Sequence, residues 1–170
     1  MHMSIPNSVA LLGIGRSNLR LIATDESSRM IPEELDATIV ADKAAGKTPL
    51  AVVASAGSVS TGAIDPLRQI AEVPHRHGVG FHIDGAYGAL AVIAASPKIR
   101  WHRTRDSISL DPHKWLYQPL DCGCLLYRSP QAARLAFSHT GDYARALSAD
   151  PVEDSYFSKN RSNCRAVSVH

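Results

Sequence analysis

The sequence predicts an α/β protein with a mostly parallel β-sheet that carries helices on both faces. Short apolar runs alternate along the chain with segments that have helix start and stop signals. Residues 50–54 are a continuous, valine-rich apolar run, which is typical of a strand covered on both faces. Residues 32–45 begin with a proline and two glutamates and end before Gly46, which predicts a helix.

The other expected elements follow the same alternation. Further strands are expected at 19–23, 80–83, 107–110 and 123–127, and further helices at 5–12, 66–77, 87–95 and 129–137. Pro74 lies inside one of these helices, where it removes a backbone hydrogen bond, so we expect a kink or an early end there. A small-residue loop, 55–62, follows the valine-rich strand.

Composition limits the function classes. The chain has 170 residues, 45% of them hydrophobic and 20% charged, which fits one globular domain with an adequate core. The formal net charge of +2 does not point to nucleic acid, and no apolar run approaches the ~20 residues that span a bilayer. The N-terminus is not a credible signal peptide. Three cysteines do not form a disulfide framework, so we expect reduced thiols and a cytoplasmic protein.

A lysine follows one of the expected strands. Residues 107–110 run into Asp111-Pro112-His113-Lys114-Trp115, and Pro112 should break the strand there. Lys114 would then lie on a loop at a strand end with apolar residues behind it. A partly desolvated lysine can become a nucleophile that forms a Schiff base with a carbonyl, although most lysines are simply solvated.

Asp84 and the 55–62 loop also follow expected strands. In open parallel sheets, ligands bind at the carboxyl ends of the strands, so we expect Asp84, Lys114 and this loop at one edge of the sheet. Taken alone, Asp84 fits a cap of the helix that follows better than a catalytic role. Two other sites are rejected: Gly13-Ile14-Gly15 lacks the third glycine of a dinucleotide loop, and the histidines at the end of 66–77 complement a helix C-terminus better than a metal.

Two motifs carry a resemblance to a known family. The first motif, Asp111-Pro112-His113-Lys114-Trp115, resembles the lysine motif of the group II pyridoxal 5'-phosphate (PLP)-dependent amino-acid decarboxylases, the aromatic-amino-acid and glutamate decarboxylase group. The second, His82-Ile83-Asp84-Gly85-Ala86-Tyr87, resembles the aspartate motif of the same family, and the order and separation of the two motifs also match. The resemblance implies that residues 1–153 are a central part of a fold-type I PLP-binding large domain. It leaves 154–170 as an atypical polar tail, expected to be truncated or disordered.

The resemblance also implies roles for residues around the cofactor ring. Lys114 would form the internal aldimine with PLP, and Asp84 would keep the pyridine nitrogen protonated. Ala86 matches the small residue on one face of the ring, and His2 aligns with the histidine that stacks on the other face. A disordered residue near the start of the chain is the alternative for His2.

Four further residues have less specific counterparts in the family. His113 would contact the cofactor or the substrate and relay protons, or merely pack at the loop edge. Tyr143 resembles the flexible-loop tyrosine that returns a proton after carbon dioxide leaves. Ser58 lies in the loop near the carboxylate side of the site. Asp111 could lie near the cofactor phosphate, where an acid is a poor ligand.

The function implied is decarboxylation of an L-amino acid to an amine and carbon dioxide, and the resemblance favours an amino acid of the aromatic type. The substrate would be a small molecule, with glutamate and other acidic amino acids left open, and the resemblance implies a homodimer. A non-catalytic or weakly active fragment is the alternative, because family members are more than twice as long and take most of their phosphate contacts from a segment that would precede residue 1.

Overall fold

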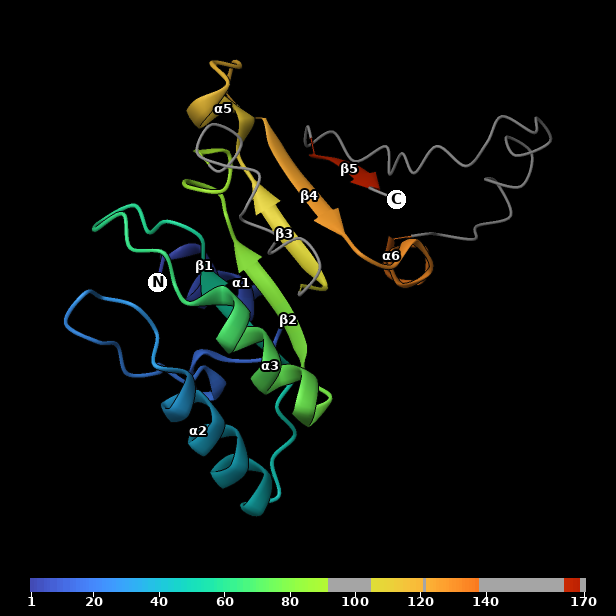
Figure 1. Ribbon diagram of the computed structural model, residues 1–170. Helices are drawn as coiled ribbons and strands as arrows, with labels where there is room; N and C mark the ends of the chain where they lie inside the picture. Colours follow the sequence, from blue (N-terminus) through green and yellow to red (C-terminus); the bar gives the residue numbers. More distant parts are fainter. Residues whose placement is uncertain (92–104, 121, 138–163, 169–170) are drawn as a thin grey trace, which may run out of the picture.

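The computed structural model describes residues 1–91, 105–120, 122–137 and 164–168 (Figure 1). Helices and strands alternate, as the sequence predicts. The helices are α1 (Ser4–Leu11), the 3-10 helix η1 (Arg16–Asn18), α2 (Pro32–Ala44), α3 (Leu67–His77), α5 (Pro112–Trp115) and α6 (Pro130–Phe137). The strands are β1 (Ala51–Ser55), β2 (Gly80–Asp84), β3 (Ser107–Leu110), β4 (Gly123–Tyr127) and β5 (Cys164–Ser168).

The strands form one mixed sheet in the order β1-β2-β3-β4-β5. Strands β1, β2 and β3 are parallel, β4 runs antiparallel to β3, and β5 is parallel to β4. At the carboxyl ends of the three parallel strands, Ser55 is paired with Asp84 and Asp84 with Ser109. The expected loops therefore leave the sheet at one edge.

Helix α3 covers one face of the parallel strands, and α2 packs against α3. Helix α3 contacts α2, β1 and β2, and Figure 1 shows α1 behind the sheet on the opposite side. The core lies between α3 and the sheet and is made of aliphatic side chains and one phenylalanine, with Ile70, Ile83 and Ile108 the largest fully buried side chains among them. On β2 the buried residues alternate with half-buried ones, so His82 and Asp84 share the face that points away from this core.

One expected strand is wrong. Residues 19–23 form no strand, and the nearby pairing is limited to an isolated antiparallel bridge between Thr24 and Met30. The side chain of Leu21 is 75% exposed, whereas Ile22 packs against the core. Half-buried and exposed residues therefore alternate over 20–23, as they would in a strand, but no neighbouring strand pairs with this segment.

Helix α3 continues through Pro74, so of the two outcomes expected there, a kink or an early end, the early end is wrong. The helix reaches His77 and stops at Gly78, which has a left-handed φ of 66°. Pro74 is fully buried, and its carbonyl accepts a hydrogen bond from Val79 N–H at 2.9 Å. Burial of the ring in the core compensates for the backbone hydrogen bond that proline removes.

The sheet differs from the prediction at its far end. Strand β5 lies within the stretch expected to be a structureless tail, and it pairs with β4 from Gly123↔Cys164 to Tyr127↔Ser168. The rest of 154–170 lies outside the described residues, and so do residues 92–95 of the helix expected at 87–95, whereas residues 87–90 form turns. The domain division at residue 153 remains a prediction. Within the described ranges, no helix is both long and apolar enough to cross a membrane.

Candidate active site

Asp84 ends β2 and is held by backbone hydrogen bonds to both neighbouring strands. Its carbonyl accepts from Ala56 N–H at 2.8 Å, and Gly85 N–H donates to the Ser109 carbonyl at 3.1 Å. The Asp84 carboxylate accepts from Ala86 N–H at 3.2 Å, within the turn that follows the strand. The position of this carboxylate is therefore fixed by the sheet edge itself.

Glycines let the loops of this edge pack backbone against backbone. A Cβ at Gly88 would lie 2.2 Å from the Ala56 carbonyl oxygen, and a Cβ at Gly57 would lie 2.9 Å from Gly88 Cα. A Cβ at Gly85 would lie 2.8 Å from the Ser109 carbonyl oxygen. The loops after β1 and β2 and the end of β3 thus approach too closely for side chains at these glycines.

Lys114 lies on α5, a single helical turn that directly follows Asp111 after β3. Lys114 N–H donates to the Asp111 carbonyl at 3.0 Å, and Lys114 Nζ lies 2.7 Å from Asp111 Oδ2. The sequence predicted a loop here, but Pro112 starts a helical turn because proline fits the first helical position. The Lys114 side chain is 33% exposed and ion-paired.

His113 links α5 to the start of β4. Its Nδ1 donates to the Cys122 carbonyl at 2.8 Å, because a carbonyl oxygen can only accept. Nε2 lies 3.9 Å from Asp111 Oδ2. With Nδ1 held by this hydrogen bond, Nε2 is the nitrogen of His113 that can exchange a proton.

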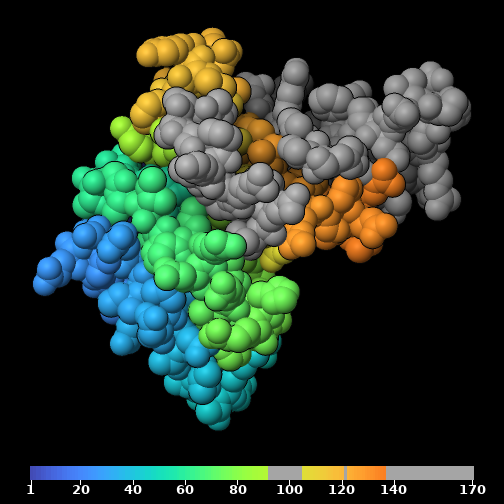
Figure 2. Space-filling view, in the orientation of Figure 1, coloured from blue at the N-terminus to red at the C-terminus, as the bar shows by residue number. Residues whose placement is uncertain are grey.

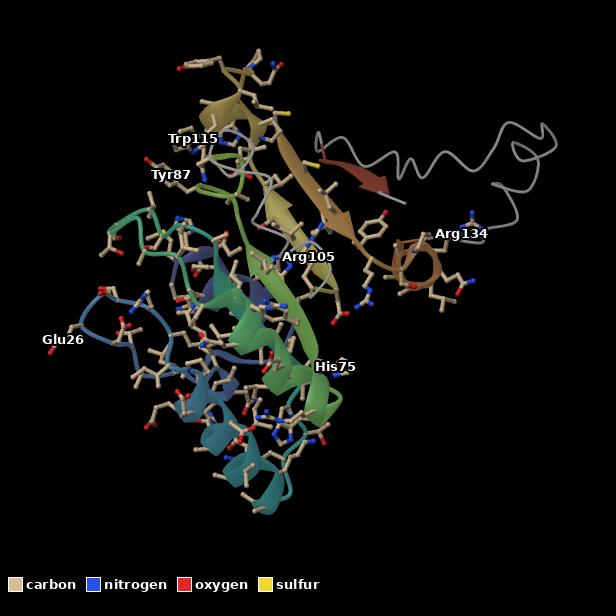
Figure 3. All side chains as sticks on the ribbon, in the orientation of Figure 1. Glu26, His75, Tyr87, Arg105, Trp115 and Arg134 are labelled. Carbon is tan, nitrogen blue, oxygen red and sulfur yellow. The ribbon has the colours of Figure 1, made fainter. Side chains whose placement is uncertain are left out.

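An aromatic pair connects the Asp84 turn to the Lys114 turn. The rings of Tyr87 and Trp115 meet edge to face, with centroids 5.9 Å apart and an interplanar angle of 71°. The two side chains are labelled side by side in Figure 3, and Figure 2 shows α5 exposed at one end of the molecule beside the residues that follow β2. The expectation that Asp84 and Lys114 follow their strands at the same sheet edge agrees with the parallel pairing of β2 and β3.

The other predicted site residues are less closely tied to this edge. The Ser58 hydroxyl is engaged within its own loop, 2.7 Å from the Thr61 hydroxyl. His2 is exposed, and its Nδ1 accepts from Ser4 N–H at 3.3 Å inside the first turn of α1. Tyr143 lies outside the described residues. The structure therefore brings together Asp84, Ala86, His113 and Lys114, whereas Ser58 and His2 make their hydrogen bonds within their own segments.

Asp65 supports the β1 side of this edge, and sequence reasoning missed it. Its carboxylate accepts from Ser55 N–H at 2.7 Å and from Met30 N–H at 2.8 Å. No signal in the sequence marks these long-range partners. The Asp111–Lys114 pair was also missed, although its spacing of three residues is one at which side chains meet on a helical turn.

Burial shifts the pKa of two groups near the site. Burial lowers the pKa of His82 below its usual range, partly offset by the nearby Asp84 carboxylate. His82 Nδ1 lies 2.8 Å from the Ser107 hydroxyl on β3. Burial, together with the neighbouring Cys122, raises the pKa of the Cys124 thiol, which favours the unreactive protonated form.

Residues 1–158 match the pyridoxal-dependent decarboxylase conserved domain. The chain belongs to this family. It is 36% identical over 146 residues to an aromatic-L-amino-acid decarboxylase of Bacillus atrophaeus, covering 85% of this chain and 30% of that protein. It is 39% identical over 129 residues to a cysteine sulfinic acid decarboxylase of Mus musculus, covering 75% of this chain and 26% of that protein.

Solved structures show the same relationship. The crystal structure of Oryza sativa TDC with PLP and tryptamine superposes with a TM-score of 0.78 at 30% identity, covering 88% of this chain and 32% of that one. The expected family, the fold-type I large-domain fragment and PLP as the family's cofactor are confirmed. The chain spans less than a third of the length of these relatives.

Proposed function

We propose that this chain is the central part of a PLP-dependent amino-acid decarboxylase, a carboxy-lyase that releases an amine and carbon dioxide. The observation that carries the proposal is the position of Asp84 and the Lys114 turn, which follow the carboxyl ends of two adjacent parallel strands. Relatives named for aromatic amino acids and for cysteine sulfinic acid are similarly close. An aromatic amino acid is the substrate class that we favour, on the resemblance of 116–126 to the aromatic branch.

The residues of this edge fit the ring of PLP. The pyridine nitrogen and the aldehyde lie at opposite ends of the ring, so the groups that bind them must come from different loops. Asp84 and Lys114 supply a carboxylate and an amine from two such loops. Ala86, in the turn after Asp84, adds little bulk beside the carboxylate. The phosphate group of PLP fits this edge less well, because the Asp111 carboxylate that is paired with Lys114 is an anion and repels phosphate.

Each residue then has a defined task. Bound PLP supplies an electron sink for the bond that breaks. The Asp84 carboxylate would hold a proton on the ring nitrogen, and the Lys114 amine would hold the cofactor at its aldehyde end. His113, oriented by Cys122, holds or moves a proton at Nε2. A proton-returning role for Tyr143, ring stacking by His2 and a contact from Ser58 are parts of the proposal that rest on the family resemblance.

Two wider features also rest on the resemblance. We propose a homodimer and a cytoplasmic location. The competing proposal is a non-catalytic fragment of such an enzyme, supported by the small share of the relatives' length that the chain spans.

The test uses the full 170-residue chain incubated with PLP, reduced with borohydride and digested for mass spectrometry. We expect the cofactor on the peptide that contains Lys114, and its loss in Lys114→Ala. The matched control is Lys47→Ala, which removes another ion-paired lysine, on the α2 side of the molecule. Cofactor spread evenly over the lysines would contradict the proposed site.

A second measurement separates the enzyme from the fragment. Release of carbon dioxide is followed with tryptophan, tyrosine, glutamate, aspartate and cysteine sulfinate. Asp84→Asn should retain the cofactor on Lys114 but lose turnover, because an amide does not hold the proton on the ring nitrogen as a carboxylate does. Cofactor attachment without turnover of any substrate would favour the fragment.

A further inference from the structure

The Lys114 amine is already bound by a carboxylate three residues before it. Nζ lies 2.7 Å from Asp111 Oδ2, and this is the shortest distance among the ion pairs that the described residues make with lysine. Asp111 has extended backbone angles, φ −117° and ψ 94°, and directly precedes the helical turn that carries Lys114. The backbone hydrogen bond from Lys114 N–H to the Asp111 carbonyl closes the same turn. Backbone and side chain of Lys114 thus both contact Asp111.

The carboxylate of Asp111 lies between α5 and the start of β4. Its side chain is 23% exposed, and its Oδ1 would lie 4.0 Å from a Cβ at Gly123, the first residue of β4. Its Oδ2 lies 3.9 Å from His113 Nε2, and His113 is itself anchored to the Cys122 carbonyl. The Asp111 carboxylate is therefore half-buried beside His113, and the longer Lys114 side chain bends toward it.

The proposed role of Lys114 needs two positions of its side chain, one bent toward Asp111 and one extended toward a carbonyl compound beside Asp84. Nζ must leave Asp111 before it can reach a carbonyl carbon held next to Asp84. The pair stabilises the bent position and lowers the population of the extended one. We infer that Asp111 is a positioning residue that holds Lys114 away from carbonyl compounds and so sets the rate at which Lys114 reacts with them. That the natural carbonyl compound is PLP rests on the function proposed above.

The first experiment measures reaction of Lys114 with an amine-selective acetyl ester, which needs no cofactor site. Peptides from timed samples of the full chain give the acetylation rate of each lysine by mass spectrometry. We expect Asp111→Asn, which keeps the size and removes the charge, to raise the Lys114 rate up to about fivefold, the range of a partly exposed ion pair. A rate equal to or below that of the unchanged chain would overturn the inference.

Two controls come from other lysines. Lys47 Nζ pairs with Asp42 at 3.1 Å, so Asp42→Asn should raise the Lys47 rate and leave the Lys114 rate unchanged. Lys43 Nζ donates to the neutral His77 carbonyl at 2.8 Å. If Asp111→Asn does not fold, added salt serves instead, because the distance over which charges interact falls from about 30 Å at 0.01 M to about 3 Å at 1 M. The unchanged chain should then show a salt-dependent rise at Lys114 that Lys43 lacks, and equal rises would overturn the inference.

The second experiment separates this inference from the proposed function. PLP replaces the ester, and borohydride traps the product at timed intervals. Faster trapping on Lys114 in Asp111→Asn supports both the inference and the proposed cofactor site. Faster acetylation with no trapping of PLP supports the role of Asp111 and contradicts the proposed function. Trapping at Lys114 with no change in either rate contradicts the role of Asp111 alone.

Discussion

The close approach of the loops at the sheet edge predicts that Gly88→Ala destabilises the fold. The new Cβ would lie 2.2 Å from the Ala56 carbonyl oxygen and 2.8 Å from Gly57 Cα, and both contacts are with backbone. Gly88 does not have a left-handed φ, so alanine there has no backbone strain of its own. The cost comes from pushing apart the loops after β1 and β2.

The size of the effect follows from the overlap. Neither neighbour is the end of a flexible side chain, so relief requires a shift of main chain of about 1 Å, and overpacking of this kind costs roughly 1–3 kcal/mol. For a chain of this length, 2 kcal/mol corresponds to a decrease in Tm of about 4–8 °C. The assay is thermal unfolding followed by circular dichroism.

The matched control is Gly123→Ala, where the nearest atom to the new Cβ is Asp111 Oδ1 at 4.0 Å. We expect its Tm to stay within about 2–4 °C of that of the unchanged chain, since a Gly-to-Ala change without a clash alters stability by less than about 1 kcal/mol. Equal Tm values for the two variants would refute the argument that backbone contact at Gly88 holds these loops together.

Two other predictions concern groups next to the site. Burial lowers the pKa of His82, so as the pH drops the unfolded chain takes up a proton at this histidine before the folded chain does, and the free energy of unfolding should fall. In urea titrations, His82→Gln should reduce the difference in the free energy of unfolding between about pH 7.5 and pH 5.5. An unchanged difference would count against this role of His82. Asp65→Ala leaves the N–H groups of Met30 and Ser55 without their acceptor and should lower the free energy of unfolding by about 3 kcal/mol, and Asp65→Asn should lower it less. A decrease below about 0.5 kcal/mol in Asp65→Ala would show that water replaces these hydrogen bonds.

Local signals predicted the elements that are local in origin. Pro32 and Gly78 bound helices where the sequence predicts, because a fixed φ and a left-handed φ are properties of single residues. The strands β3 and β4 have the predicted bounds. The direction of β4 depends on how it pairs with β3, and the existence of β5 depends on a partner distant in the chain, and local periodicity contains no information about either.

The site shows the same division. Asp84 and Lys114 could be placed at one sheet edge, since both follow apolar runs that were expected to be parallel strands. The state of Lys114 could not be predicted, because its exposure and its pairing depend on how α5 turns after Asp111. The role of Asp65 could not be predicted either, because its two partners lie in separate segments.

The reversal of chain direction at β4 has a consequence for the order in which the molecule assembles. Leu110 pairs with Cys124, only 14 positions later, whereas Asp84 pairs with Ser109 across 25 positions and Ser55 with Asp84 across 29. Closing the shorter loop costs less chain entropy, by about 0.6 kcal/mol for each doubling of length.

We therefore expect the β3–β4 hairpin, with the Asp111–Lys114 pair on its connection, to form before the parallel strands dock. Pulsed hydrogen exchange during refolding should then protect β4 amides ahead of β1 amides, and the opposite order would contradict this. On that route the lysine meets its carboxylate early, and Asp84 joins the site only when β2 pairs with β3.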